Sequence, residues 1–386
     1  MKFNITDSVE YIGVNDRTID LFESQYIVPN GVSYNSYIIK DDKIVIMDTV
    51  DKRATNEWLE NLENSLGKSK PNFLVISHLE PDHSANIELL AEKYPNMKII
   101  LNARTENMMK QFFDRDFSDR YVIVKEGDII DIGNHKLQFF MVPMVHWPEV
   151  MVTYEQTEKI LFTADGFGKF GTLDTEEDWA CEARRYYFNI CGKYGAQVQA
   201  LLKKASNLDI KIICPLHGPI LKENLEYYIN KYDVWSSYKP EDKGILIAYN
   251  SIHGNTAKAV EKLEEMLKQN GVEKVIVSDL AREDIAEVIE DAFRYDKMII
   301  ATPTYDAGLF PATELFLRDL KHKNYQNRKI GIMENGSWAP MAAKNVKEIL
   351  SDMKDIQVCD TVVTLKTRMN EQNVEQMENL VKEILE

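Results

Sequence analysis

Residues 78–83 read HLEPDH and carry four side chains that can bind a metal ion: His78, Glu80, Asp82 and His83. The segment follows NFLVIS (72–77), an apolar and β-branched run that is typical of a strand. Pro81 should prevent a helix from continuing through the segment. We therefore expect a turn that points all four side chains inward.

Three more candidate ligands each follow or end a predicted strand: His146 in VHWPEV, Asp165 in FTADGFG and His217 in CPLHGP. Taken alone, a histidine or aspartate in such a position is more often part of a structural turn than a ligand. These three, however, stand beside glycine or proline at strand ends, where side chains converge at the rim of a sheet. The sequence therefore favours a metal site over three unrelated turns.

The types of these side chains indicate which metal they suit. They are four histidines and three carboxylates, without a thiolate among them. Imidazole and carboxylate suit iron, manganese or zinc, and a high share of carboxylates favours the harder ions. A single tetrahedral zinc ion uses fewer ligands than this. Two metal ions that share one bridging carboxylate would use them all.

A second constellation begins where the predicted strand GILIAYN (244–250) runs into Ser251-Ile252-His253-Gly254-Asn255-Thr256 and then into a helix. Hydroxyl groups, backbone N–H groups freed by Gly254 and the positive end of a helix form a cradle for a phosphate. An ordinary Ser/Thr cap of a helix is the alternative interpretation. The loop has no lysine, which excludes the P-loop pattern of NTPases.

Two further loops contain aromatic and small residues. They are Pro303-Thr304-Tyr305-Asp306-Ala307-Gly308 and Glu334-Asn335-Gly336-Ser337-Trp338. Tyr305 and Trp338 could flank a flat ring, and the glycines let backbone groups approach its polar edge. The three loops resemble the phosphate loop and the two isoalloxazine loops of flavodoxin, and this resemblance implies FMN.

The elements that must position these groups differ between the two parts of the chain. Residues 32–50 read as a hairpin around Asp41-Asp42. Short strands then alternate with helical stretches, which predicts a mixed α/β domain. These strands are NFLVIS (72–77), KIIL (98–101), YVIV (121–124), KLQFFMV (136–142), KILFTA (159–164) and IKIICP (210–215).

From Gly244 onward, apolar strands alternate regularly with amphipathic helices, which predicts a doubly wound parallel sheet with ligands at the carboxyl ends of its strands. The strands after GILIAYN are KVIVSDL (274–280), KMIIATP (297–303), KIGIME (329–334) and VVTLKT (362–367). A segment with turn and charge character precedes the change of pattern, with Pro240 near its end. We therefore expect one domain over residues 1–242 and a second over residues 243–386.

The HLEPDH segment resembles the signature H-x-H-x-D-H of the metallo-β-lactamase fold, with Glu80 in place of the second histidine. That replacement marks the flavodiiron proteins, or A-type flavoproteins, which pair such a domain with a C-terminal flavodoxin-like one. The resemblance covers the whole chain. It implies that one iron is held by His78, Glu80 and His146, the other by Asp82, His83 and His217, with Asp165 as the bridge. It also implies that Tyr187, in RRYYFNI, donates a hydrogen bond near the irons.

The same resemblance implies an activity: reduction of O2 to water, or of two NO to N2O, at a non-haem diiron site that FMN refills with electrons. Both gases would meet the same ligands, and we expect O2 to be the preferred substrate. The resemblance further implies a head-to-tail homodimer or a dimer of dimers. Since no rubredoxin-like or reductase module follows the flavodoxin-like part, we expect a separate electron donor, either rubredoxin or a deazaflavin-linked protein.

Two other functions compete with this interpretation. A zinc hydrolase of the metallo-β-lactamase fold with an attached flavodoxin would use many of the same residues, although Glu80 counts against it. A non-catalytic electron carrier with a merely structural metal domain is the second alternative. Metal analysis separates the first from a diiron reductase, and gas consumption by the reduced protein separates the second.

Composition narrows the partners and the compartment. A formal net charge of −16 would repel a phosphate backbone, so nucleic acid is not expected as a partner. The start of the chain does not resemble a signal peptide, and no apolar run is long enough to span a bilayer, so we expect a cytoplasmic protein. The four cysteines form no C-x-x-C pair and are expected to be buried, reduced thiols.

One motif is expected to be a coincidence. Residues 166–171 read GFGKFG and satisfy the dinucleotide fingerprint G-x-G-x-x-G. That fingerprint must open the helix of a βαβ unit, whereas GTLDTEEDW follows here. We therefore expect no nicotinamide nucleotide to bind at this segment.

Overall fold

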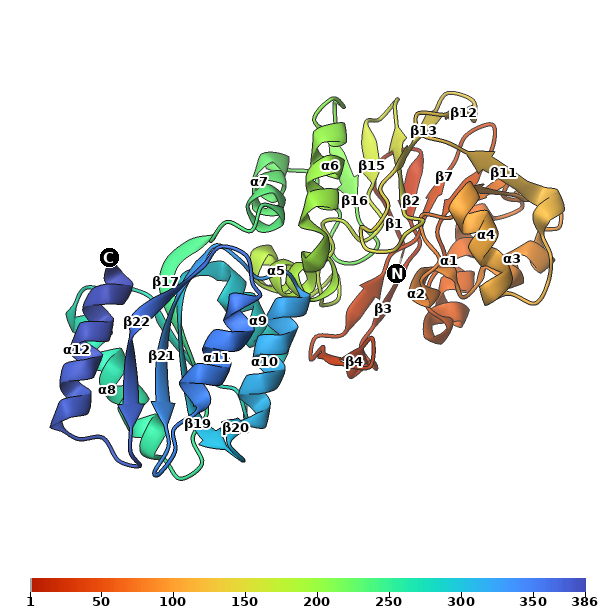
Figure 1. The fold of residues 1–386 in the computed structure, drawn as a ribbon. Coiled ribbons are helices and arrows are strands. Elements are labelled where there is room, and N and C mark those ends of the chain that lie inside the picture. The colour runs from red at the N-terminus through yellow and green to blue at the C-terminus, as the bar shows by residue number, and fades with distance from the viewer. Residues whose placement is uncertain (1) are drawn as a thin grey trace. The chain divides into compact units, whose positions relative to one another are not determined.

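The computed structural model describes residues 2–386, and the chain divides into two compact units (Figure 1). The N-terminal unit comprises Met1–Tyr187 and Ala196–Asp233, and the C-terminal unit comprises Phe188–Gly195 and Val234–Glu386. The short segment Phe188–Gly195 thus belongs to the C-terminal unit although it lies far from it in the sequence. A boundary between separately folding domains at residue 242 stays a prediction.

The N-terminal unit contains two facing sheets. The first has the strand order β1-β2-β7-β8-β9-β10-β11 and the second the order β12-β13-β14-β15-β16. The strands of the first sheet are β1 (Phe3–Asn4), β2 (Val9–Tyr11), β7 (Tyr37–Ile39), β8 (Val45–Met47), β9 (Phe73–Val75), β10 (Lys98–Asn102) and β11 (Tyr121–Val124). Those of the second are β12 (Ile129–Asp131), β13 (Lys136–Met141), β14 (Met151–Glu155), β15 (Ile160–Phe162) and β16 (Ile212–Cys214).

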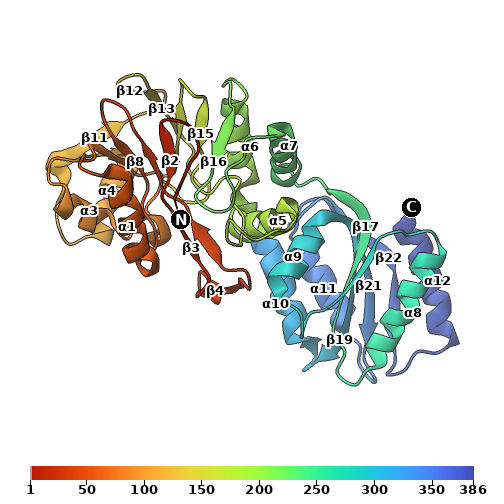
Figure 2. The same cartoon turned by 180° about the vertical axis from the view of Figure 1, so that it is seen from behind.

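Helices lie on the outer faces of these sheets. Both views place α1, α3 and α4 beyond the first sheet and α6 beyond the second (Figures 1 and 2). The helices up to residue 236 are η1 (Lys52–Ala54), α1 (Thr55–Leu66), α2 (Pro81–Ser84), α3 (Ile87–Lys93), α4 (Ala103–Phe112), η2 (Ser118–Arg120), α5 (Trp179–Ile190), η3 (Gly192–Tyr194), α6 (Gly195–Ala205) and α7 (Leu225–Ser236). Two small antiparallel pairs complete the unit: β3 (Val14–Asp16) with β6 (Val32–Tyr34), and β4 (Leu21–Phe22) with β5 (Tyr26–Ile27).

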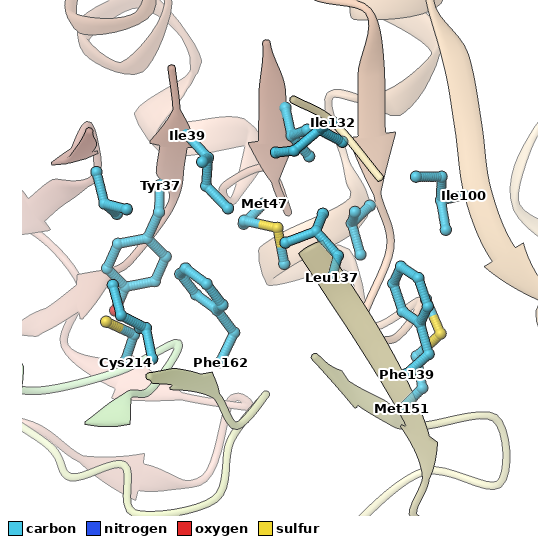
Figure 3. Packing of buried hydrophobic residues seen from close by; sticks show 14 of the residues in the cluster. Tyr37, Ile39, Met47, Ile100, Ile132, Leu137, Phe139, Met151, Phe162 and Cys214 are labelled. Carbon is cyan, nitrogen blue, oxygen red and sulfur yellow. The ribbon is translucent and has the colours of Figure 1, made fainter. Parts of the chain in front are cut away.

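The core of the N-terminal unit fills the space between the sheets. Tyr37, Ile39 and Met47 from the first sheet face Leu137, Phe139 and Phe162 from the second (Figure 3). Leu137 and Phe139 are two residues apart on β13 and both fully buried, because alternate side chains of a strand point to the same face. The apolar residues at every second position therefore bring the two sheets together.

The C-terminal unit is built on a sheet of order β18-β17-β19-β21-β22, in which each of these neighbouring pairs is parallel. Its strands are β17 (Asp242–Tyr249), β18 (Val275–Asp279), β19 (Tyr295–Tyr305), β21 (Arg328–Asn335) and β22 (Ile356–Leu365), and β20 (Gly308–Leu309) pairs with the end of β19. The helices are α8 (Asn255–Gln269), α9 (Ile285–Arg294), α10 (Pro311–His322), α11 (Ala342–Ser351) and α12 (Glu371–Leu385). Helices α8 and α12 cover one face and α9, α10 and α11 the other (Figures 1 and 2).

The predicted fold class is confirmed. Every strand expected from the sequence is present, and β7 and β8 form the expected hairpin, in which Tyr37 faces Met47. The strands at the N-terminus, together with β12 and β14, were not predicted. They are mostly two or three residues long, too short for alternation to be recognised, whereas β14 is buried at all five positions and shows no alternation.

Candidate metal centre and cofactor cavity

The seven candidate ligands lie on loops at the ends of strands. Those at positions 78–83 follow β9, Asp165 follows β15, His217 follows β16, and His146 lies between β13 and β14. The expectation for Pro81 was wrong in one respect, because Pro81 begins the short helix α2 instead of only blocking one. Proline suits the first position of a helix, where its missing N–H has no intrahelical partner.

One group of four candidate ligands consists of Asp165 and three side chains near it, those of His78, Glu80 and His146. His146 Nε2 lies 2.9 Å from Asp165 Oδ2 and 2.9 Å from Glu80 Oε2. His78 Nε2 lies 3.4 Å from the same oxygen of Asp165. Within this group the candidate ligand atoms all lie within 4.8 Å of one another, a spacing compatible with bonds of about 2 Å to one ion.

The remaining three ligands form a second group on the other side of Asp165. His217 Nε2 lies 3.1 Å from Asp82 Oδ2 and 3.1 Å from His83 Nε2. Asp165 turns its other oxygen, Oδ1, toward His217 at 3.9 Å. Since its two oxygens face different groups, the Asp165 carboxylate is placed to be shared between two metal ions.

Burial and charge act strongly on these side chains. Burial alone would lower the pKa of His78, but the charges of Asp165, Asp82 and Glu80 outweigh it and raise that pKa to about 10. Burial and the nearby His217 lower the pKa of His83. Burial would raise the pKa of Asp165, yet His78 and His146 hold it well below its usual value. The carboxylates thus raise the pKa of His78 and of His217, and a metal cation would compete with protons at these rings.

Several polar atoms of the cluster fit a metal better than they fit an empty protein interior. Both ring nitrogens of His78, both oxygens of Asp82 and Oδ1 of Asp165 are buried and have no hydrogen-bond partner within residues 2–386. Buried polar atoms are normally paired. Three carboxylates also offset most of the charge of two divalent cations. The donor set therefore fits a pair of metal ions.

Aromatic side chains and one hairpin surround the cluster, and the sequence alone did not indicate them. The ring centroid of Tyr186 lies 5.6 Å from that of His217, and Phe22 on β4 lies 5.3 Å from it. The neighbouring Tyr187 has its ring 5.2 Å from that of Tyr232, and its expected role near the metals stays a prediction. Helix α5 turns these adjacent residues in different directions, and the letters YY do not tell which one faces the site.

The β4–β5 turn also carries Glu23, a residue that local patterns gave no reason to select. Partial burial and repulsion from Glu80 raise the pKa of Glu23 to about 7, against an opposing effect of His146. The charge of a candidate ligand, Glu80, thus raises the pKa of Glu23, although the Glu23 side chain is exposed at the surface.

The C-terminal unit contains a cavity of about 460 Å³ at the carboxyl ends of β17, β19 and β21. Fourteen of its sixteen lining residues belong to the predicted cofactor loops; these are Ser251, Ile252, His253, Asn255, Thr256, Pro303, Thr304, Tyr305, Asp306, Ala307, Asn335, Gly336, Ser337 and Trp338. The predicted Gly254 and Gly308 are not among the lining residues, whereas Ala339 and Thr367, which lie outside the predicted loops, are. Thr367 follows the last strand of the sheet, and extending the strand-end argument to that strand would have found it.

Hydrogen bonds fix the three loops around this cavity. Asn335 donates to Thr256 Oγ1 and to the Thr367 carbonyl, and Thr304 Oγ1 accepts from the backbone of Met341. Gly254 begins helix α8 with φ +83°, a left-handed conformation that glycine adopts without a steric penalty. Helix α8 therefore presents its N-terminus to the cavity without a side-chain cap from Gly254. The volume of the cavity, the N-terminus of α8 and the exposed rings of Tyr305 and Trp338 together fit a ligand that consists of a phosphate and a flat ring.

Two other sequence expectations can be compared with the structure. Residues 166–171 contain no helix, and the next helix begins only at Trp179, so the GFGKFG motif does not open a helix. Cys191, Cys214 and Cys359 are buried as expected, but Cys181 is exposed. Cys181 lies in the first turn of α5, on a side of the helix that does not pack inward, which the cysteine spacing does not reveal. No helix within residues 2–386 combines the length and apolar character that crossing a bilayer requires.

Comparison with known proteins agrees with the fold class predicted for the two parts of the chain. Residues 32–218 match the ODP family beta lactamase, and residues 246–385 match a flavodoxin domain. An uncharacterised protein of Methanocaldococcus jannaschii is 30% identical over 97% of this chain and 95% of its own length. An anaerobic nitric oxide reductase flavorubredoxin of Vibrio vulnificus is 28% identical over 95% of this chain and 76% of its own length.

Solved structures resemble the chain over its whole length. The rubredoxin oxygen:oxidoreductase of Desulfovibrio gigas superposes with a TM-score of 0.93 at 24% identity, covering 100% of this chain and 98% of that one. A mutant of the flavo di-iron protein of Thermotoga maritima superposes with a TM-score of 0.90 at 25% identity, covering 100% of this chain and 98% of that one. These likenesses support the fold that the sequence predicts.

Proposed function

Since the chain belongs to the flavodiiron protein family, we propose that it is an FMN-dependent oxidoreductase that reduces a small diatomic gas at a non-haem diiron site. The observation that carries this proposal is the arrangement of the seven histidine and carboxylate side chains around Asp165, whose two oxygens face different ligand groups. A metallo-β-lactamase-type hydrolase is not favoured, because relatives such as those of Vibrio vulnificus and Aliivibrio fischeri are named as nitric oxide reductases.

We assign one iron to His78, Glu80 and His146, the other to Asp82, His83 and His217, and the bridge to Asp165. When bound, the iron pair supplies two electrons to a gas molecule and FMN supplies two more. Four electrons and four protons convert O2 to two water molecules, whereas two electrons and two protons convert two NO to N2O and one water. We propose O2 as the preferred substrate, with NO as the second.

The protein's own side chains have three tasks in this scheme. The three carboxylates hold the cations and compensate their charge. Phe22, Tyr34 and Tyr186 surround the histidine rings and limit the entry of water. The third task, proton supply, we assign to Glu23, whose pKa is raised to about 7 by burial and by the charge of Glu80.

Electrons must also reach the metal centre, which extends the proposal to partners. We propose a separate donor such as rubredoxin or a deazaflavin-linked protein, and a head-to-tail homodimer in which one chain's FMN serves its partner's irons. The exposed Trp338 and Tyr305 at the mouth of the FMN cavity, 93% and 45% accessible, are compatible with such an interface. A cytoplasmic location is part of the same proposal.

The decisive experiment uses iron-replete, FMN-loaded protein. After anaerobic reduction, oxygen and NO electrodes should record consumption of at least one gas, and metal analysis should give two irons per chain. Zinc in place of iron, with esterase or lactamase activity and no gas consumption, would establish the hydrolase instead. Iron-replete reduced protein that consumes neither gas would identify an electron carrier.

A further inference from the structure

The loop between β13 and β14 carries a buried carboxylate that is not one of the seven ligands. We propose that Glu149 is a positioning residue that holds together the two loops supplying one iron, so that His78, Glu80 and His146 are presented as a unit. This inference rests on the proposed function, because it assigns Glu149 a role at the first iron of that centre.

The central contact joins two segments that are 70 residues apart. The backbone N–H of Leu79 donates to Glu149 Oε1 at 2.8 Å. Leu79 stands between His78 and Glu80, while Glu149 stands three residues after His146. Leu79 is fully buried and Glu149 is 1% exposed, so water does not compete for this bond. A single carboxylate oxygen thus links both loops of the first ligand group.

The Leu79 N–H depends on this carboxylate. Strand β9 ends at Val75 and helix α2 begins at Pro81, so regular secondary structure supplies Leu79 with no acceptor. A backbone N–H left buried without an acceptor is destabilising. Without Glu149, we expect the peptide between His78 and Leu79 to rotate until the Leu79 N–H finds another acceptor. Such a rotation displaces the adjacent ligands His78 and Glu80.

Glu149 is itself held firmly. Asn102 Nδ2 donates to the Glu149 carbonyl at 2.6 Å, and the Arg104 guanidinium donates to the Pro148 carbonyl at 3.0 Å. Beside this contact, Met151 N donates to Ser77 O at 2.9 Å and pairs the beginning of β14 with the residue before His78. These hydrogen bonds hold the backbone around Glu149 in place, and with it the Glu149 side chain.

The second ligand group has different supports. The backbone and hydroxyl of Thr49 donate to the His83 carbonyl at 3.0 Å and 2.8 Å. His217 Nδ1 lies 2.8 Å from the Ser33 carbonyl and donates to it. Neither support involves Glu149, so its loss should weaken the first iron and leave the second largely in place.

Only one oxygen of Glu149 is needed for this role. Glu149 Oε2 is buried and has no hydrogen-bond partner within residues 2–386, whereas Oε1 makes the bond to Leu79. Glutamine retains an oxygen that can accept from Leu79, and alanine does not. Glu149→Gln should therefore keep the function that Glu149→Ala loses. Glu155→Ala is a matched control, since Glu155 is also fully buried and also accepts backbone N–H groups, those of Thr157 and Glu158, at the other end of β14.

The test titrates metal-free, full-length variants with ferrous iron under anaerobic conditions and follows the two sites by Mössbauer spectroscopy. In Glu149→Ala the affinity of one site should fall about 10- to 100-fold, the usual effect of losing a group that orients a ligand. In the same variant, the iron affinity of the second site and the FMN content should stay close to the wild-type values. Glu149→Gln and the control Glu155→Ala should bind iron at both sites with an affinity close to that of the wild type. Equal weakening of both sites, or of neither, would overturn the inference.

Hydrogen–deuterium exchange on the metal-free protein separates this inference from the proposed function. Residues 77–80 should exchange faster in Glu149→Ala than in the wild type or Glu149→Gln. Unchanged exchange at these residues would refute the positioning role, whatever metal the protein binds. If the wild type takes up no iron, but residues 77–80 still exchange faster in Glu149→Ala than in the wild type, only the diiron proposal is refuted.

Discussion

At the scale of single residues, Asp165 is the member of the cluster with the most far-reaching contacts. Its Oδ2 lies near His146 and His78 while its Oδ1 faces His217, so one side chain serves both ligand groups. Glu80, in contrast, contacts the first group alone, through His146 and His78. The two carboxylates should therefore differ in what their removal does.

Replacing Asp165 by alanine should remove both irons, whereas Glu80→Ala should mainly remove the first. Each loss of affinity should exceed the about 100-fold effect of a missing supporting group, because a direct ligand disappears. Gas reduction should stop in both variants, and FMN content should stay at the wild-type level. Iron and flavin analysis of the purified variants checks this, and full turnover by Glu80→Ala would show that the ligand set is misplaced.

At the scale of elements, the junction between β17 and α8 decides how the phosphate is held. Gly254 adopts φ +83° in the turn that opens α8, and no atom lies within 4 Å of the place where a Cβ would stand. A substitution there is opposed by backbone conformation and not by crowding. A substitution at Gly254 therefore measures how much the backbone conformation of this loop contributes to FMN binding.

Gly254→Ala should weaken FMN binding by about 1–2 kcal/mol, the usual cost of a left-handed conformation for a residue with a side chain. This corresponds to a dissociation constant roughly 5- to 30-fold higher. Fluorescence titration of the flavin-free protein measures the change, and iron content serves as the control. Wild-type affinity for FMN would mean that this turn does not form the phosphate cradle.

Another element-scale feature is a connection between two turns of the N-terminal unit. His135 Nδ1 lies 2.7 Å from Asp41 Oδ2, which also accepts from the backbone of His135 at 2.8 Å. Burial would raise the pKa of Asp41, but the bonds from His135, Asp42 and Asn134 lower it to about 2. The ionised carboxylate thus joins the β7–β8 turn to the β12–β13 turn.

A carboxyl group whose pKa is lowered on folding stabilises the protein above its unfolded pKa and loses this effect as the pH falls through the folded value. Asp41→Asn should therefore be less stable than the wild type by about 1 kcal/mol at pH 5, after allowance for solvent screening. The difference should shrink between pH 4 and pH 2. Urea unfolding at pH 5 and at pH 2.5 tests this, and an equal difference at both values would contradict it.

At the scale of the whole molecule, each of the two compact units consists of two separate segments of the sequence. Phe188 belongs to the C-terminal unit, is 1% exposed, and stacks on Phe293 with ring centroids 4.2 Å apart. The Tyr238 hydroxyl donates to the Gly192 carbonyl within the same unit. A segment that precedes most of this unit by about 40 residues of sequence therefore supports its packing.

Phe188→Ala should destabilise the C-terminal unit by about 3–5 kcal/mol, as is usual when a buried aromatic ring is removed. Heating should then release FMN at a lower temperature, while the release of iron stays near the wild-type temperature. Phe139→Ala, in the core between the two sheets of the N-terminal unit, should have the opposite pattern. Loss of both cofactors together in either variant would show that the units unfold as one.

The sequence by itself determined the kinds of element and the kinds of ligand. Alternation and regular spacing predicted the strands. The HLEPDH segment and three residues beside glycine or proline at strand ends supplied the seven candidate ligands, and loops after predicted strands supplied most of the cavity lining. These features are local, because strand period and turn chemistry act over a few residues. Very short strands, and the uniformly buried β14, carry too little periodic signal and were missed.

Only the tertiary structure decided which distant groups meet. It placed the Tyr186 ring beside His217, made Pro81 the first residue of a helix, and brought the Glu149 carboxylate to the backbone of Leu79. Each of these depends on the packing of segments far apart in the sequence. A buried N–H must find an acceptor somewhere, but neither its own neighbours nor those of Glu149 specify that the two will pair.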